Sequence, residues 1–172
     1  MVVEYAVDES KENVALRFII GPSPRKIQLP KGYKLTFGKG VSLTEGKDAI
    51  LFAYGPVMLH EALLASELLA ERGVGLKVVN MPWLNCIDLK WLEEVIKPYG
   101  LVFVLEDHHP AGALHDHMLE VLAASRNQPL AKRRMMRFAV EGWPACGTPQ
   151  EALKHHRLDG ASLAERILEA SD

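Results

Sequence analysis

The stretch Asp48-Ala-Ile-Leu-Phe-Ala-Tyr-Gly55 decides the fold, because its apolar residues run without a break between an acidic residue and a Gly-Pro turn. Such a short apolar run between turn signals is typical of a strand buried on both faces. Residues 58–72 then carry apolar side chains at helical spacing, and Gly73 is placed to end a helix. A buried strand followed directly by a helix indicates the first half of a parallel βαβ unit.

The same alternation continues towards the C-terminus. It predicts further strands at 76–81, 101–105 and 137–141, and further helices following Asp88 and at 114–124, 149–156 and 162–170. Asp88 is a suitable N-cap, and Ser162 with Glu165 resembles a capping box. We therefore predict an α/β fold, a three-layer α/β/α sandwich with a mostly parallel five-stranded sheet. Residues 41–43 could add one antiparallel edge strand.

Composition places the chain among ordinary globular proteins. It has 172 residues, 48% hydrophobic and 24% charged, with a formal net charge of −2. This balance argues against disorder and coiled coil, and it gives no electrostatic reason to expect a nucleic acid or a membrane as partner. Two widely spaced cysteines and an acidic N-terminal stretch without a signal-peptide pattern lead us to expect a cytoplasmic location.

Residues 1–37 differ from the rest of the sequence. A charged start leads to the apolar run 14–20, which predicts a strand. A segment rich in proline, glycine and lysine follows and is typical of a linker. We therefore expect two parts, with residues 1–37 forming the end of a preceding domain and its linker, and residues 38–172 forming the sandwich.

The richest set of reactive side chains follows the expected strand at 101–105. It comprises Glu106, Asp107 and His108, with His115 nearby, and ligands of open α/β sheets bind at the carboxyl ends of strands. One interpretation is a free-standing module that binds a metal or a small anion through the loop 106–117. The other is a polar loop whose acids lie near a helix N-terminus.

His108 has two interpretations of its own. It could act as an acid or base oriented by Glu106, as in an autonomous hydrolase, or it could be a structural histidine bonded to a backbone carbonyl. The sequence offers no nucleophile as its partner, and it lacks a P-loop, a dinucleotide fingerprint and a nucleophile elbow. We predict no catalytic residue and no metal ligand set. The basic step Lys132-Arg133-Arg134 is more typical of a solvated loop than of a phosphate site.

Three motifs carry a resemblance to a known family. They are the strand opening GKDAILFAYG at 46–55, the turn Glu106-Asp107-His108 with Gly112 six residues after the glutamate, and the ending LKHHRLD at 153–159. They resemble the domain entry, the E-D-H…G-G-L-G loop and the L-x-x-x-G-L-D tail of the transketolase C-terminal domain. This family includes transketolases, 1-deoxyxylulose-5-phosphate synthases and the beta subunits of 2-oxoacid dehydrogenases, and the resemblance extends from about Phe37 to Leu168.

The sequence departs from the family pattern at several positions. The family's G-G-L-G reads Gly112-Ala113-Leu114-His115, so two of its glycines are replaced. The loss of a glycine matters wherever the backbone must approach closely or turn to positive φ.

The resemblance also implies functional assignments. Arg17 would inherit the role of a family arginine that contacts the substrate phosphate, and His108 is a second substrate-binding candidate, with Glu106, Asp107 and Gly112 as loop candidates. The family uses thiamine diphosphate and Mg²⁺, held by a Gly-Asp-Gly…Asn-Asn motif that this sequence lacks. We therefore expect no cofactor bound by this chain, which would be inactive alone. We expect it to form the structural C-terminal domain of a homodimeric transferase that lines the active-site approach, with the enzyme's remaining domains or subunit as partners.

Overall fold

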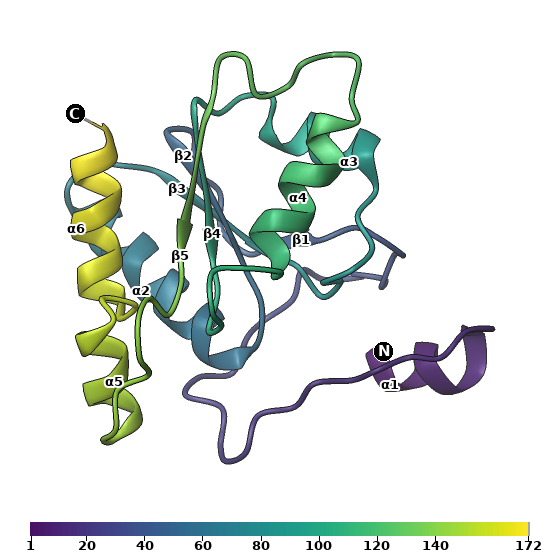
Figure 1. Ribbon diagram of the computed structural model, residues 1–172, viewed down its shortest axis with the longest axis horizontal. Coiled ribbons are helices and arrows are strands. Elements are labelled where there is room, and N and C mark those ends of the chain that lie inside the picture. The colour runs from purple at the N-terminus through teal and green to yellow at the C-terminus, as the bar shows by residue number, and fades with distance from the viewer. Residues whose placement is uncertain (172) are drawn as a thin grey trace.

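Five strands form one sheet in the order β1-β3-β2-β4-β5 (Figure 1). The computed structural model describes residues 1–171. The strands are β1 (Val41–Ser42), β2 (Ala49–Ala53), β3 (Leu76–Asn80), β4 (Leu101–Leu105) and β5 (Arg134–Phe138). β2 runs parallel to β3 and β4, and β5 runs parallel to β4, whereas β1 pairs with β3 in the antiparallel sense. The predicted fold class is confirmed, including the antiparallel edge strand.

Four main helices cover the two faces of this sheet. They are α2 (Pro56–Glu71), α3 (Leu89–Ile96), α4 (Leu114–Ala123) and α6 (Gly160–Ser171), and the short α5 (Pro149–His155) precedes α6. Leu51 packs in the hydrophobic cluster that holds residues of α2 and α6, and its neighbours Ile50 and Phe52 pack in the cluster that holds residues of α3 and α4. Successive strand residues point to opposite faces, so the continuous apolar run of β2 fills both cores.

The last strand begins three residues earlier than expected. Its register places Phe138 opposite Leu105, and the Phe138 ring stacks on Phe103 with centroids 5.2 Å apart. Pairing with β4 continues back to Arg134, which lies opposite Leu101, so the strand includes Arg134, Met135 and Met136. The mixture of arginine and methionine hid that part of the strand from a pattern based on apolar runs.

Two helix starts test the predicted caps. Asp88 accepts the backbone N–H of Trp91 at 2.9 Å and is the N-cap of α3, as expected. The cap predicted at Ser162 is wrong, because α6 begins at Gly160 and the Ser162 N–H donates to the Asp159 carboxylate at 3.2 Å. The acidic side chain three positions earlier is the better acceptor for the first turn.

Residues 1–37, here called the N-terminal arm, begin with α1 (Val2–Glu4) and a π-helical turn η1 (Tyr5–Glu9). No strand forms between residues 10 and 37, so the strand predicted at 14–20 is wrong for this chain. The segment has no neighbouring strand to pair with, and strand pairing requires one. Side chains fasten the arm instead: the rings of Tyr5 and Phe37 each lie 5.0 Å from that of Trp83.

Within residues 1–171, no helix has both the length and the apolar character that crossing a bilayer would require.

Candidate functional site

The carboxyl edge of the sheet holds the candidate site. The chain passes from β2 to β3 on one side and later places β4 on the other side of β2. The carboxyl ends of β2 and β4 therefore form the switch point at which open α/β sheets bind ligands. Tyr54 follows β2 there, and Glu106 and Asp107 follow β4.

Arg17 of the arm reaches this switch point. Its guanidinium donates two hydrogen bonds to the Asp107 carboxylate, at 2.8 and 3.1 Å, across 90 positions of sequence. This bidentate contact raises the pKa of Arg17. Tyr54 lies buried beside the pair, and burial, followed by the negative charges of Glu106 and Asp107, raises the pKa of its hydroxyl. The structure thus brings together two of the residues singled out in the sequence, Arg17 and Asp107.

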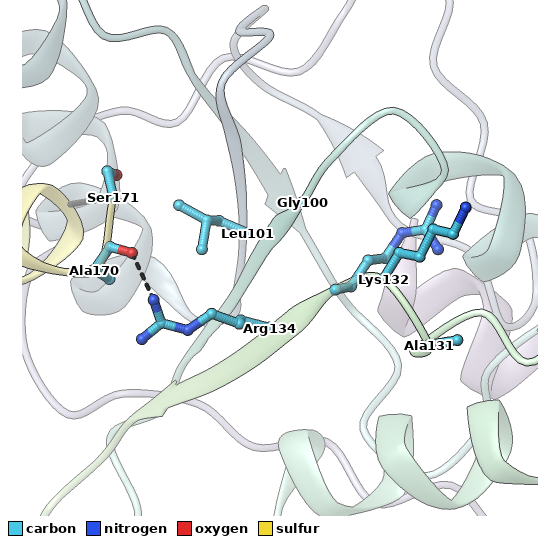
Figure 2. Close-up of a pocket in the computed structure, with 8 residues that line it drawn as sticks. Gly100, Leu101, Ala131, Lys132, Arg134, Ala170 and Ser171 are labelled. Carbon is cyan, nitrogen blue, oxygen red and sulfur yellow. Dashed lines mark hydrogen bonds between the residues drawn. The ribbon is translucent and has the colours of Figure 1, made fainter.

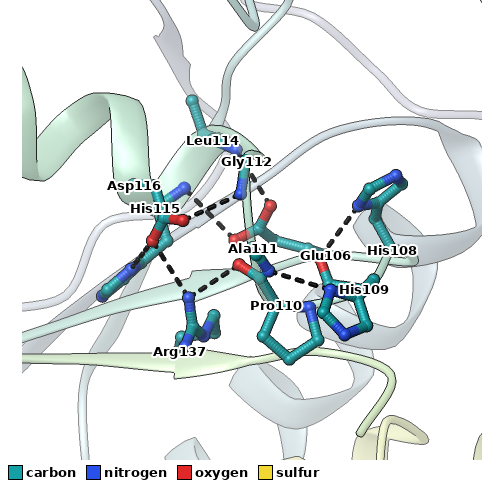
Figure 3. A network of polar contacts seen from close by, with 10 residues as sticks. All are labelled: Glu106, His108, His109, Pro110, Ala111, Gly112, Leu114, His115, Asp116 and Arg137. Carbon is teal, nitrogen blue, oxygen red and sulfur yellow. Dashed lines mark hydrogen bonds and ion pairs between the residues drawn. The ribbon is translucent and has the colours of Figure 1, made fainter.

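Glu106 is fully buried and is committed to the backbone. Its two carboxylate oxygens accept the N–H groups of Leu114 at 2.9 Å and His115 at 3.2 Å, so it caps the first turn of α4 (Figure 3). Burial raises the pKa of Glu106, and these two hydrogen bonds oppose that rise. Because it is fully buried and bonded to the start of α4, Glu106 shapes the loop rather than contacting a ligand.

A second network fixes the loop 106–113. Arg137 of β5 donates to the Pro110 carbonyl at 2.7 Å and to the Asp116 carboxylate at 3.0 Å (Figure 3). Asp116 in turn accepts the N–H of Gly112 at 2.8 Å, and Gly112 has a φ of +78°, which favours glycine. The predicted loop residue Gly112 therefore has a conformational role. Sequence reasoning did not pair Arg137 with Asp116, although an arginine within a sheet strand is a signal that it has a partner.

The histidines of this region do not converge. His108 and His109 are exposed, and the Nδ1 of His108 lies 2.8 Å from the carbonyl oxygen of His109. His115 is buried against Asp116, and burial lowers the pKa of its imidazole. Over residues 1–171, no cluster of three or more histidine, cysteine or carboxylate side chains is arranged to hold a metal ion. The metal-module interpretation of the loop therefore has no structural support.

The basic step lies at the opposite, amino edge of the sheet. There, a shallow depression of about 490 Å³ is lined in part by Lys132, Arg133 and Arg134 (Figure 2). Arg133 donates to the Ile96 carbonyl at 3.1 Å, and Arg134 donates to the Ala170 carbonyl at 3.0 Å. Both guanidinium groups thus cap the carboxyl ends of helices, which agrees with a structural interpretation of the step.

The sequence and the fold can be compared with known proteins. A sequence model described as "Transketolase, C-terminal domain" matches residues 38–163. A protein of Methanocaldococcus jannaschii named as a transketolase C-terminal section is 34% identical over 134 residues, which cover 77% of this chain and 40% of the relative. The 1-deoxy-D-xylulose-5-phosphate synthase of Syntrophotalea carbinolica is 30% identical over 142 residues, covering 82% of this chain and 22% of the relative.

Solved structures show the same fold. One described as a split gene transketolase, inactive beta4 tetramer, superposes with a TM-score of 0.72 at 27% identity, over 86% of this chain and 46% of that chain. A transketolase of Pichia stipitis superposes with a TM-score of 0.53 at 18% identity, over 78% of this chain and 18% of that chain. This chain therefore spans less than half the length of each of these relatives.

Proposed function

Because the chain belongs to the family of transketolase C-terminal domains, we propose that it is the structural C-terminal unit of a thiamine-diphosphate-dependent, transketolase-type transferase. The observation that carries this proposal is the ordered match over residues 38–163, combined with the small share of each relative that the chain covers. The reactive parts of the enzyme would then lie on other polypeptide segments.

The side chains at the carboxyl edge do not fit the cofactor. Mg²⁺ prefers carboxylate and carbonyl oxygens as ligands. Both carboxylate oxygens of Glu106 accept hydrogen bonds from backbone N–H groups, and both carboxylate oxygens of Asp107 accept hydrogen bonds from the Arg17 guanidinium. Since Glu106 is buried and Asp107 is paired with Arg17, neither carboxylate is presented to a metal ion, and we propose that thiamine diphosphate and its Mg²⁺ bind elsewhere in the enzyme.

Arg17 and His108 are the residues that we propose to contact the substrate. Both are exposed at the switch point, and an arginine fork suits a phosphate or carboxylate group. Glu106, Asp107 and Gly112 would serve them by fixing the loop. Within this chain the Arg17 guanidinium is already paired with the Asp107 carboxylate, so an anionic substrate would have to replace that carboxylate.

The arm is proposed to be the end of the preceding domain. In the segment 14–20, the side chains of Val14, Leu16, Phe18 and Ile20 are exposed, which leaves one apolar edge uncovered. These uncovered apolar side chains support packing of the segment against another part of the enzyme. The partners would be the remaining domains and a second copy of this chain, as in a homodimer, in the cytoplasm. The related chain described as a tetramer of a split gene transketolase supports both kinds of assembly.

The test begins with the coding sequence next to the gene for this chain, where the remaining domains would be encoded. The chain should show no tight binding of thiamine diphosphate with Mg²⁺ by isothermal titration. Combined with the polypeptide that carries the remaining domains, it should restore ketol transfer that depends on thiamine diphosphate. Tight cofactor binding by this chain alone would overturn the proposed division of roles.

A further inference from the structure

We propose that His156 is a pH-sensitive latch, which holds the loop 142–147 when its imidazole is neutral and releases the loop when the imidazole is protonated. The Nε2 of His156 accepts the backbone N–H of Ala145 at 3.0 Å. An imidazole nitrogen accepts a hydrogen bond only through its lone pair, and a protonated imidazole has donors on both nitrogens. Protonation would therefore place two donors face to face and break the contact. This property belongs to the chain alone and does not depend on the proposed function.

The contact with His156 is the one hydrogen bond that ties the loop to the rest of residues 1–171. No other hydrogen bond in this part of the chain has its donor or its acceptor within residues 142–147. Ala145 is half-buried, whereas the other residues of the loop are exposed. Segments with few buried contacts and few hydrogen bonds open at the lowest free-energy cost. Loss of this hydrogen bond is therefore expected to free the middle of the loop.

Both ends of the loop are held by contacts that remain when His156 is protonated. Before the loop, the Val140 N–H donates to the His108 carbonyl at 3.0 Å. After it, Thr148 and Glu151 form the capping box of α5, and the hydrogen bonds from Thr148 lower the pKa of the Glu151 carboxyl. That carboxylate therefore stays charged over the range in which imidazoles titrate. Protonation should move the loop and leave β5 and α5 in place.

The surroundings of His156 offer no partner for a protonated imidazole. The rings of His155 and His156 meet edge to face, with centroids 4.9 Å apart. Among residues 1–171, the histidines within ion-pairing distance of a carboxylate are His60, His115 and His117. The other charged or titratable groups of the segments that meet here are Glu141, Cys146, Glu151, Lys154, Arg157, Asp159, Arg166 and Glu169. No ion pair therefore compensates for the lost hydrogen bond when His156 gains a proton.

The latch determines how Trp143 is presented. Its side chain is 92% exposed, and it lies two residues before Ala145. The loop follows β5 at the carboxyl edge of the sheet, which is the edge that holds the candidate site. Neutral His156 restrains the indole at this edge, whereas protonation lets it move. Because imidazoles usually change charge between about pH 5 and about pH 8, the device would respond near neutral pH.

NMR spectra of the full chain between about pH 5 and about pH 8 test the latch. We expect the Ala145 amide signal to shift with the same midpoint as the ring protons of His156. The heteronuclear NOE of residues 142–147 should fall on the acid side of that midpoint. At the neutral end, the Ala145 amide should exchange at least about tenfold more slowly than in an unstructured peptide at the same pH, and this protection should disappear at the acid end.

Substitutions separate the latch from its surroundings. The amide oxygen of His156→Gln accepts a hydrogen bond but does not titrate, so this variant should hold the loop at every pH. His156→Leu should leave the loop free at every pH. His155→Gln is the matched control, because it removes the neighbouring imidazole and should keep the transition, and circular dichroism checks that each variant is folded. A wild-type Ala145 amide that does not respond to pH, or a transition that persists in His156→Gln, would overturn the inference.

Discussion

The Glu61 carboxylate accepts the backbone N–H of Gly160 at 2.7 Å, so a side chain in the middle of α2 caps the first turn of α6. This contact joins residues 99 positions apart, and Glu61 is among the few charged residues that the core buries. The contact holds the first turn of α6 against α2.

Replacing Glu61 should destabilise the chain. Glu61→Ala leaves the buried Gly160 N–H without an acceptor and should lower the free energy of unfolding by about 1–2 kcal/mol. Urea denaturation measures the change. Glu71→Ala is the control, because Glu71 is an exposed glutamate at the end of the same helix, and its effect should be within about 0.5 kcal/mol. Equal effects of the two variants would mean that the Glu61 contact adds nothing to stability.

Gly160 should not tolerate a side chain. A Cβ at this position would lie 2.6 Å from the Cβ of Leu64, so α2 and α6 would have to separate. Gly160→Ala should therefore cost about 1–3 kcal/mol of unfolding free energy. Gly100→Ala is the matched control, since a Cβ there meets no atom within 4 Å. A Gly160→Ala chain as stable as the control would show that the two helices separate at little cost.

The buried Glu106 should make stability depend on pH. Its pKa in the folded chain is raised above the ordinary value of 4.5, chiefly by burial, so the folded chain holds the proton more tightly than the unfolded chain. The resulting contribution to the free energy of unfolding is fully present below pH 4.5 and is lost as the pH rises through the raised pKa. Glu106→Gln does not titrate, so its free energy of unfolding should rise relative to that of the wild type as the pH increases. Urea unfolding from about pH 4 to about pH 8 would test this, and parallel curves would contradict it.

Arg157 adopts a φ of +54° at the position where the family tail has glycine. A left-handed conformation strains any residue with a Cβ. We therefore expect Arg157→Gly to be more stable than Arg157→Ala by about 1 kcal/mol in thermal unfolding. Both variants lose the same 3.5 Å contact with Glu169, so their difference isolates the backbone. If the alanine variant were equally stable, the strain at this position would be negligible.

The fold could be predicted from the sequence because its signals are local. Unbroken apolar runs such as 49–53 specify strands buried on both faces, and the capping role of Asp88 depends on a neighbour three positions away. The exceptions depend on tertiary contacts. The start of β5 depends on its pairing with β4, and the segment 14–20 has the pattern of a strand but no strand to pair with.

The candidate site was harder to predict. Of the two interpretations of the loop 106–117, the structure agrees with the polar loop whose acids lie near a helix N-terminus, because Glu106 is buried as the cap of α4. The sequence could not choose between them, because burial of Glu106 depends on tertiary packing. The pairing of Arg137 with Asp116 was not predicted, because the two residues lie 21 positions apart in the sequence. The substrate-binding roles of Arg17 and His108 stay predictions.

Tyr5 and Phe37 both contact the indole of Trp83, so the two ends of the arm meet at one side chain. The arm is thereby a closed loop anchored at its base. The entropy cost of closing a flexible loop grows only by about 0.6 kcal/mol for each doubling of its length. Evolution or an engineer could therefore lengthen the span between the two rings, or graft a new segment into it, and leave the sandwich beneath intact.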